Sequence, residues 1–231
     1  MIEKISADDH FLFDGGWLKS RYHFSFAGYH NPLKMNFGPL RVLNDDILKP
    51  GEGFDTHPHK DMEIISYCVE GELTHRDSMG GTEVLKPGDV QYISAGTGIF
   101  HSEINKAKSK TRFIQIWIMP GKRGLKPSYK IKKFQKEDRK NKLLKIVSGI
   151  EGECDLKIYQ NVEIFVGEFE PQKNTEYKIK YGNIVYLTVI EGSGYINGVY
   201  VSKRDAVKME KEELLAIESE KGMHLILLDM K

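Results

Sequence analysis

The chain has 231 residues, 40% of them hydrophobic and 29% charged, which is typical of a soluble globular protein with one large or two modest domains. Its formal net charge of +1 argues against nucleic acid as the main ligand. No stretch approaches the ~20 apolar residues of a membrane span, and no apolar run follows Met1 as in a secretory signal. Because Cys68 and Cys154 lie far apart in a chain without a secretory signal, we expect buried thiols rather than a disulfide. We also expect a cytoplasmic location and a monomer.

The N-terminal part of the chain, residues 1–50, is rich in aromatic side chains. Short strands are predicted at 22–26 and 37–44, with turns at Gly15-Gly16 and Asn31-Pro32. We expect these aromatic side chains to pack in the core.

Short apolar strands separated by turns follow, at 62–68, 90–93 and 112–119. Further strands at 72–77 and 82–85 flank Gly80-Gly81, which predicts a hairpin with a tight turn. Many short strands with a turn roughly every 8–12 residues indicate a β-barrel or a β-sandwich.

Residues 120–142 interrupt this rhythm. The segment contains glycine, proline and a lysine-rich run, so we interpret it as a solvated connector with some helix. The alternative is an anion-binding patch, for which the near-neutral charge of the whole chain gives little support.

Strands return at 143–147, 156–163, 164–170 and 184–190, and with them a repeat. Glu191-Gly192 followed by Asp205 echoes Glu70-Gly71 followed by Asp89. We therefore predict two copies of one β unit, divided as an N-terminal domain at 1–125 and a C-terminal domain at 126–231.

Two short pairs of polar residues stand out in the first copy, namely His57 with His59, and His101 with Glu103. Residues two apart in a strand point to the same face, so each pair offers two ligand groups on one side of a strand. Three imidazoles and a carboxylate suit a divalent transition metal. The carboxylate is left open at this point, because Glu63 shares the parity of the first pair if the strand has no bulge.

The second copy lacks these ligands. The interval from Glu70 back to the first pair, counted back from Glu191, ends near Lys178 and Lys180. The interval from Asp89 on to the second pair, counted on from Asp205, ends near Ile217 and Ser219. No histidine occurs between His101 and His224, so we expect a scaffold without a metal site. The remaining histidines are not assigned to metal. These are His10, His23, His30, His75 and His224. His75, on the predicted hairpin, is expected on the solvated surface.

The spacing of His57, His59, Glu63 and Gly71 is similar to the first cupin motif, and the chain resembles the pirin family closely over roughly residues 10–120. The matching stretches are WLKSRYHFSFA (17–27), FGPLRVLN (37–44), HPHKDME (57–63), HRDSMG (75–80), PGDVQ (87–91) and SAGTGIFHSE (94–103). This resemblance implies an all-β bicupin of two facing β-barrels (double-stranded β-helices) with few short helices. It also implies one metal in the N-terminal barrel.

Pirins carry the metal on residues that here are His57, His59, His101 and Glu103. Several bacterial pirins are quercetin 2,3-dioxygenases, which open the flavonol C ring with O2 and release carbon monoxide. Other members, mainly eukaryotic, are nuclear cofactors of transcription. We therefore expect Glu103 as the fourth ligand and general base, with Glu63 orienting a metal-binding histidine.

The expected substrates are a flavonol and O2, and the expected cofactor is one divalent metal. Fe(II) or Ni(II) suits oxygen chemistry, although Cu, Co, Mn and Zn fit the same donors. Two other interpretations stay open. One is a metal-containing, redox-sensitive binding protein without enzymatic activity, and the other is a different cupin reaction on a small acid.

Overall fold

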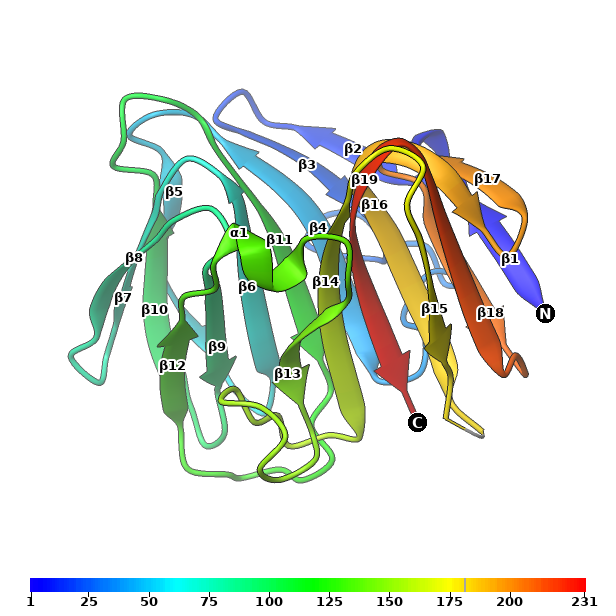
Figure 1. Cartoon of the computed structure of the whole chain (residues 1–231). Helices are drawn as coiled ribbons and strands as arrows, with labels where there is room; N and C mark the ends of the chain where they lie inside the picture. The colour runs from blue at the N-terminus through cyan, green and yellow to red at the C-terminus, as the bar shows by residue number, and fades with distance from the viewer. Residues whose placement is uncertain (181) are drawn as a thin grey trace. The chain divides into compact units, whose positions relative to one another are not determined.

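A computed structural model describes residues 1–180 and 182–231 and consists almost entirely of strands (Figure 1). Within these residues the helical elements are a 3₁₀ turn at Ala7–Asp9 and α1 (Lys136–Arg139). The all-β prediction is therefore confirmed. None of the described helices is long or apolar enough to cross a membrane.

The chain forms two compact units. The N-terminal unit comprises Phe11–Phe134 and Ile158–Gln160, and the C-terminal unit comprises Met1–His10, Gln135–Lys157 and Asn161–Lys231. These units differ from the predicted division at 125/126 because of strand pairing. β1 (Ile2–Ile5) pairs with β18 (Ala206–Glu210), and β12 (Ser128–Lys132) pairs with β9 (Val90–Ser94).

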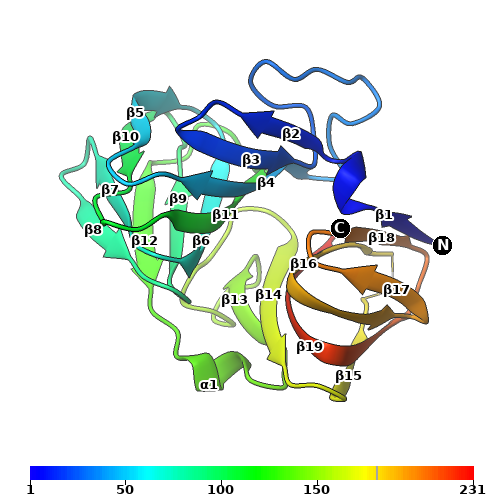
Figure 2. The same cartoon turned by 90° about the horizontal axis from the view of Figure 1, so that it is seen from above.

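Two antiparallel sheets make up the N-terminal unit. The larger has the order β12-β9-β6-β11-β4-β3-β2, and the smaller has the order β5-β10-β7-β8, which lies along one side of the unit in Figure 2. Their remaining strands are β2 (Phe11–Asp14), β3 (Leu18–Tyr22), β4 (Leu40–Leu48), β5 (Gly53–His59), β6 (Glu63–Glu70), β7 (Leu73–Asp77), β8 (Thr82–Leu85), β10 (Ile99–Ile104) and β11 (Thr111–Ile118). Apolar side chains from both sheets, such as Leu48, Leu73, Leu85 and Phe113, are buried together in the core.

Most predicted strands of this unit are present, with shifted ends. The hairpin over 72–77 and 82–85 is confirmed as β7 and β8. The strand predicted at 22–26 instead ends at Tyr22, and Phe26 makes only an isolated bridge with Tyr29. Residues 128–132 were expected in a connector but form β12 at the edge of the larger sheet.

The C-terminal unit contains one sheet of eight strands, with the order β1-β18-β16-β19-β14-β13, while β15 pairs with β19 and β17 pairs with β16. Its further strands are β13 (Leu144–Ser148), β14 (Val162–Phe169), β15 (Asn174–Lys178), β16 (Ile184–Ile196), β17 (Val199–Ser202) and β19 (Leu214–Met230). The strand predicted at 156–163 is wrong over most of its length. Lys157 makes only an isolated bridge, and β14 begins at Val162.

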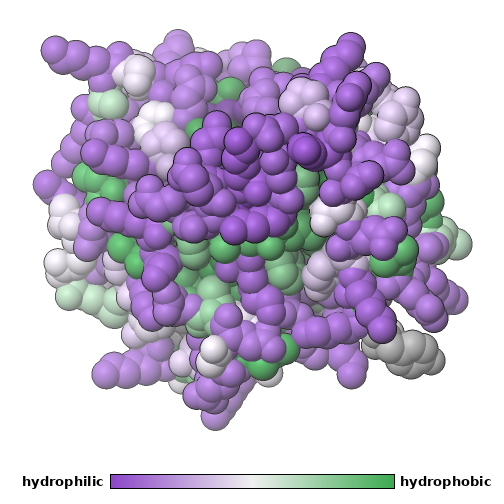
Figure 3. Space-filling model, viewed as in Figure 1, coloured by the Kyte–Doolittle hydropathy of each residue, from purple (hydrophilic) through white to green (hydrophobic). Residues whose placement is uncertain are grey.

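The lysine-rich segment is largely solvated, and hydrophilic side chains gather over the face on which α1 lies (Figure 3). Several of its cations pair with carboxylates of the C-terminal unit. Arg139 lies 2.8 Å from Glu168, and Lys140 lies 2.7 Å from Glu170. These pairs favour the connector interpretation over an anion-binding patch.

The predicted repeat is visible in matching hydrogen bonds. The amide of Cys68 donates to the carbonyl of Asp89 at 3.1 Å, and the amide of Val189 donates to the carbonyl of Asp205 at 3.0 Å. Both aspartates also accept a hydrogen bond from the amide three residues earlier. The turn that contains Asp89 and the turn that contains Asp205 therefore have the same hydrogen bonds.

Gly192, in the repeated Glu-Gly pair, lies within β16 beside an irregularity of its pairing with β19, and it tests how closely the two strands approach. Its φ is +83°, and an added Cβ would meet the carbonyl of Gly222, whereas Gly198 has φ +77° and open space around it. An alanine at either position costs about 1–3 kcal/mol from backbone strain. The overlap at Gly192 adds about 1–3 kcal/mol more. We expect urea unfolding to show a clearly larger loss for Gly192→Ala than for Gly198→Ala, and equal losses would contradict the tight approach.

Candidate metal centre

The predicted metal-binding histidines meet on the smaller sheet of the N-terminal unit. His101 on β10 lies directly opposite His57 on β5. The ring centroids of His57, His59 and His101 are 4.5–4.8 Å apart, and one ring nitrogen from each lies within 4.8 Å of the others. The spacing of two residues thus brings the three imidazoles to one point.

A β-bulge on β5 helps to aim these side chains. Phe54 pairs with Glu103 and His57 pairs with His101, so β5 has one more residue than β10 between these points. Because of this extra residue, Phe54 and His57 face the same side although they are three apart.

The corresponding strand of the C-terminal unit lacks the bulge. On β15, Thr175 pairs with Ile217 and Tyr177 pairs with Leu215. The backbone of Asn105 exchanges hydrogen bonds with Gly51 and Glu52 as that of Ser219 does with Gln172 and Lys173. Counted from these turns, the counterpart of His57 is Tyr177, which packs against the apolar core. Among the described residues, groups of His, Cys, Asp and Glu able to hold a metal lie in the N-terminal unit.

The protonation state of the histidines suits metal binding. Nδ1 of His57 lies 2.7 Å from the carbonyl oxygen of Asp55, so this nitrogen carries the hydrogen and Nε2 keeps its lone pair. Both ring nitrogens of His101 are buried without a hydrogen bond among the described residues. Burial and the neighbouring imidazoles lower the pKa of His59 and of His101 to about 3. Neutral imidazoles with open lone pairs are the form that binds metal, so these residues fit a divalent transition metal.

Glu103 is 1% exposed and is held by three hydrogen bonds. Its Oε1 accepts from the Gln91 amide at 2.6 Å and the Ser66 hydroxyl at 3.3 Å, and its Oε2 accepts from the Gln115 amide at 2.8 Å. Because each carboxylate oxygen has two lone pairs, Oε2 keeps one of them open. The carboxylate lies within 4.8 Å of ligand nitrogens of His75 and His101.

The partners of Glu103 belong to a polar row across the larger sheet. Asn44 pairs with Gln115, Gln115 with Ser66, and Ser66 with Gln91 on successive strands. The indole of Trp117 donates to Oε1 of Gln115 at 3.1 Å, which leaves the amide nitrogen of Gln115 for Glu103. Polar side chains of the larger sheet thus hold the Glu103 carboxylate in place.

Glu63 does not have the expected contacts with a histidine. Its carboxylate accepts hydrogen bonds from the Tyr92 hydroxyl, the Ser94 hydroxyl at 2.6 Å and the backbone amide of Tyr159 at 3.1 Å. Its hydrogen bonds therefore hold strand β9 and the segment around Tyr159, and the expectation that Glu63 orients a histidine is corrected.

The expectation of a solvated His75 is wrong, because this residue is 0% exposed. Its Nε2 lies 2.9 Å from Asp77, and its ring stacks on Tyr129 at 4.4 Å. Burial alone would raise the pKa of Asp77, but hydrogen bonds from His75 and the amides of Gly81 and Met79 outweigh it and lower the pKa. The missed signal was parity, since His75 shares the inward face of the apolar Leu73.

Comparisons with known proteins agree with this fold. A sequence profile described as "Pirin" matches residues 5–118, and one described as "Quercetinase C-terminal cupin domain" matches residues 145–230. Quercetin 2,3-dioxygenase of Escherichia coli K12 is 38% identical over 216 residues, which cover 93% of this chain and 92% of that protein. A pirin-like protein of Caulobacter vibrioides is 39% identical over 229 residues, covering 99% and 97%.

A crystal structure of the bacterial pirin YhhW from Escherichia coli, in complex with nickel(II), has a TM-score of 0.94 to this chain. It is 35% identical and is matched over 100% of this chain and 99% of that one. Together with the two profiles, this similarity confirms the predicted bicupin fold.

Proposed function

Because this chain belongs to the pirin family, we propose that it is a metal-dependent dioxygenase that cleaves a flavonol such as quercetin with O2 and releases carbon monoxide. The observation that carries this proposal is the meeting of three histidines with open lone pairs beside a buried carboxylate. The name of the Escherichia coli relative supports the choice of substrate. A cytoplasmic location and a monomeric state are part of the proposal.

His57, His59, His101 and Glu103 would hold the metal in the N-terminal domain. Once bound, a divalent metal would act as a Lewis acid on a substrate hydroxyl and make O2 chemistry accessible. Ni(II) gains support from the nickel complex of YhhW, and Fe(II) remains the other choice for this reaction.

Glu103 would accept the proton of the flavonol hydroxyl. Because its one open lone pair is on Oε2, that oxygen would either bind the metal or accept the proton, and the proton role requires it to give up the metal. Gln91, Ser66 and Gln115 would keep the carboxylate from turning in either role. The apolar and aromatic surroundings of the histidines, including Trp117 against the ring of His59 at 4.8 Å, would exclude water around the bound flavonol.

The test is carbon monoxide release from quercetin in air. The protein is loaded in turn with Fe(II), Ni(II), Cu(II) and Zn(II), and the metal content of each sample is measured. We expect carbon monoxide release with at least one metal. His101→Ala should lose both the bound metal and the release of carbon monoxide. His30→Ala, which changes an exposed histidine outside the cluster, should keep both. No release from protein holding one metal per chain would favour a binding protein or a cupin reaction without O2.

A further inference from the structure

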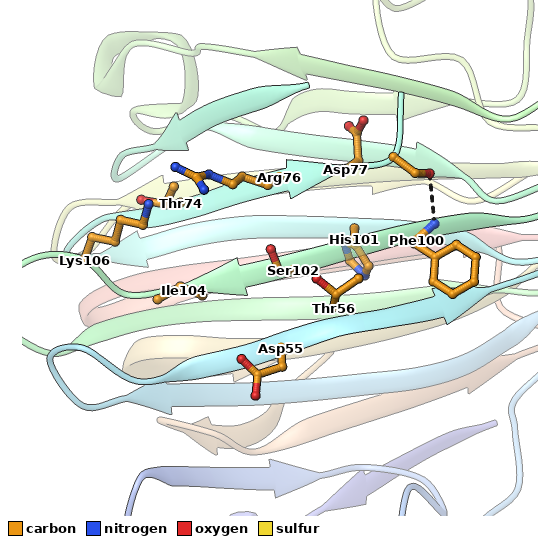
Figure 4. Close-up of a pocket in the computed structure, with 11 residues that line it drawn as sticks. Asp55, Thr56, Thr74, Arg76, Asp77, Phe100, His101, Ser102, Ile104 and Lys106 are labelled. Carbon is orange, nitrogen blue, oxygen red and sulfur yellow. Dashed lines mark hydrogen bonds between the residues drawn. The ribbon is translucent and has the colours of Figure 1, made fainter. Parts of the chain in front are cut away.

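A groove of about 390 Å³ lies on the smaller sheet of the N-terminal unit, and the proposed mechanism does not use most of its lining (Figure 4). Side chains alternate between the two faces of a strand, so Ser102 faces away from its neighbours His101 and Glu103. The residues that shape the groove are Thr56, Thr74, Arg76, Phe100, Ser102 and Lys106. His101 and Ile104 also line the groove, so it borders the histidine cluster at His101.

One end of the groove is cationic. Arg76 and Lys106 reach toward each other beside Thr74 (Figure 4), and within the described chain neither forms an ion pair. Two carboxylates also border the groove. Asp55 lies across it on β5, and Asp77 is held by His75 and two amides. The two cations consequently keep their hydrogen-bond donors available for an anion.

Two hydroxyls near this end lack partners. Thr74 is 7% exposed and Ser102 is 9% exposed, yet neither side chain makes a hydrogen bond in the described part of the chain. Neither hydroxyl oxygen is fully buried, so both can donate to a ligand or to water in the groove. Both hydroxyls are in the part of the groove that Arg76 and Lys106 overhang (Figure 4).

The other end of the groove is aromatic. Phe100 is 54% exposed and lies at the opposite end from Lys106 in Figure 4, while Ile104 lies near the cations. Four residues of strand separate these two apolar side chains, which corresponds to about 13 Å. This length matches an extended molecule of two aromatic rings better than a bare anion.

We propose that this groove binds a small aromatic carboxylate, with its carboxylate on Arg76 and Lys106 and its rings along Ile104 and Phe100. Arginine suits this role because its planar guanidinium donates two parallel hydrogen bonds to a carboxylate. Opening of a flavonol C ring gives a two-ring ester that bears a carboxylate, so the groove suits the product class of the reaction. Only this last link rests on the proposed function.

Calorimetric titration of the metal-loaded protein with biphenyl-4-carboxylate tests the proposal without any turnover. We expect one saturable site that weakens at least about tenfold in Arg76→Gln, where charge-assisted hydrogen bonds are lost. A loss of about fivefold is expected in Phe100→Ala, where the ring contact is lost. Lys108→Ala is the matched control, since this exposed lysine lies outside the groove, and it should bind as the unaltered protein does.

Three outcomes would overturn the assignment. The first is the absence of saturation at millimolar ligand, and the second is equal binding by Arg76→Gln and the unaltered protein. The third is loss of binding in His59→Ala, which changes a histidine of the cluster outside the groove and would place the carboxylate at the metal. Inorganic phosphate and the neutral biphenyl-4-methanol complete the design, and equally tight binding of either would refute an aromatic carboxylate as the ligand class.

Discussion

Replacing Glu103 with glutamine is expected to leave metal bound to the three histidines and to lower quercetin turnover at least about a hundredfold, the scale of a lost general base. A glutamine side chain has the same shape, but its amide cannot accept the flavonol proton. It would also turn an NH2 group toward Gln91 or Gln115, both of which donate to the carboxylate now. The measurement is kcat for carbon monoxide release at equal metal content, with metal determined for every sample.

Glu83→Gln provides the matched control, because Glu83 is an exposed glutamate on β8 of the same unit. It should keep both metal and turnover. Normal turnover by Glu103→Gln would show that another group takes the proton. Complete loss of metal in this variant would assign Glu103 chiefly to binding, since the histidines alone would then be too weak.

The sequence predicted the histidine cluster because the period of a strand is two. Both pairs keep that period within their own strand, and β10 brings His101 opposite His57 without any further information. The bulge on β5 was not predictable from parity. It is visible only in the pairing with β10.

Two errors near the site have a common physical reason. His75 was judged by residue type, because polar residues are usually exposed, and Glu63 by its parity with His57 and its place in the cupin motif. In the structure each is buried because a specific partner satisfies it, Asp77 for the first and Tyr92 for the second. Tyr92 lies on the neighbouring strand, so its contact follows from register, which a single sequence specifies weakly. Asp77 lies two residues from His75 on the same strand, so parity could have found this contact.

Replacing Arg112 with methionine is expected to cause the largest loss of stability in the N-terminal unit. The guanidinium binds both oxygens of Asp45, with Nε 2.6 Å from Oδ1 and the second nitrogen 2.7 Å from Oδ2. Both side chains are only 4% exposed. Removal of the guanidinium takes both of these charge-assisted hydrogen bonds from a buried carboxylate, which costs about 3–5 kcal/mol. The measurement is the free energy of unfolding in urea, at constant metal content.

The double variant Asp45→Leu/Arg112→Met separates the loss of the pair from the cost of the orphaned charge. A buried ion pair and a well-packed apolar pair are often similar in stability, because desolvation offsets much of the attraction between the charges. We therefore expect the double variant to recover most of the stability lost in Arg112→Met. Asp14→Asn is the exposed control, since its pair with Lys19 spans 3.6 Å at the surface, and it should change stability by no more than about 0.5 kcal/mol. A double variant as unstable as the single one would mean that the guanidinium stabilises the barrel through its packing rather than through its charge.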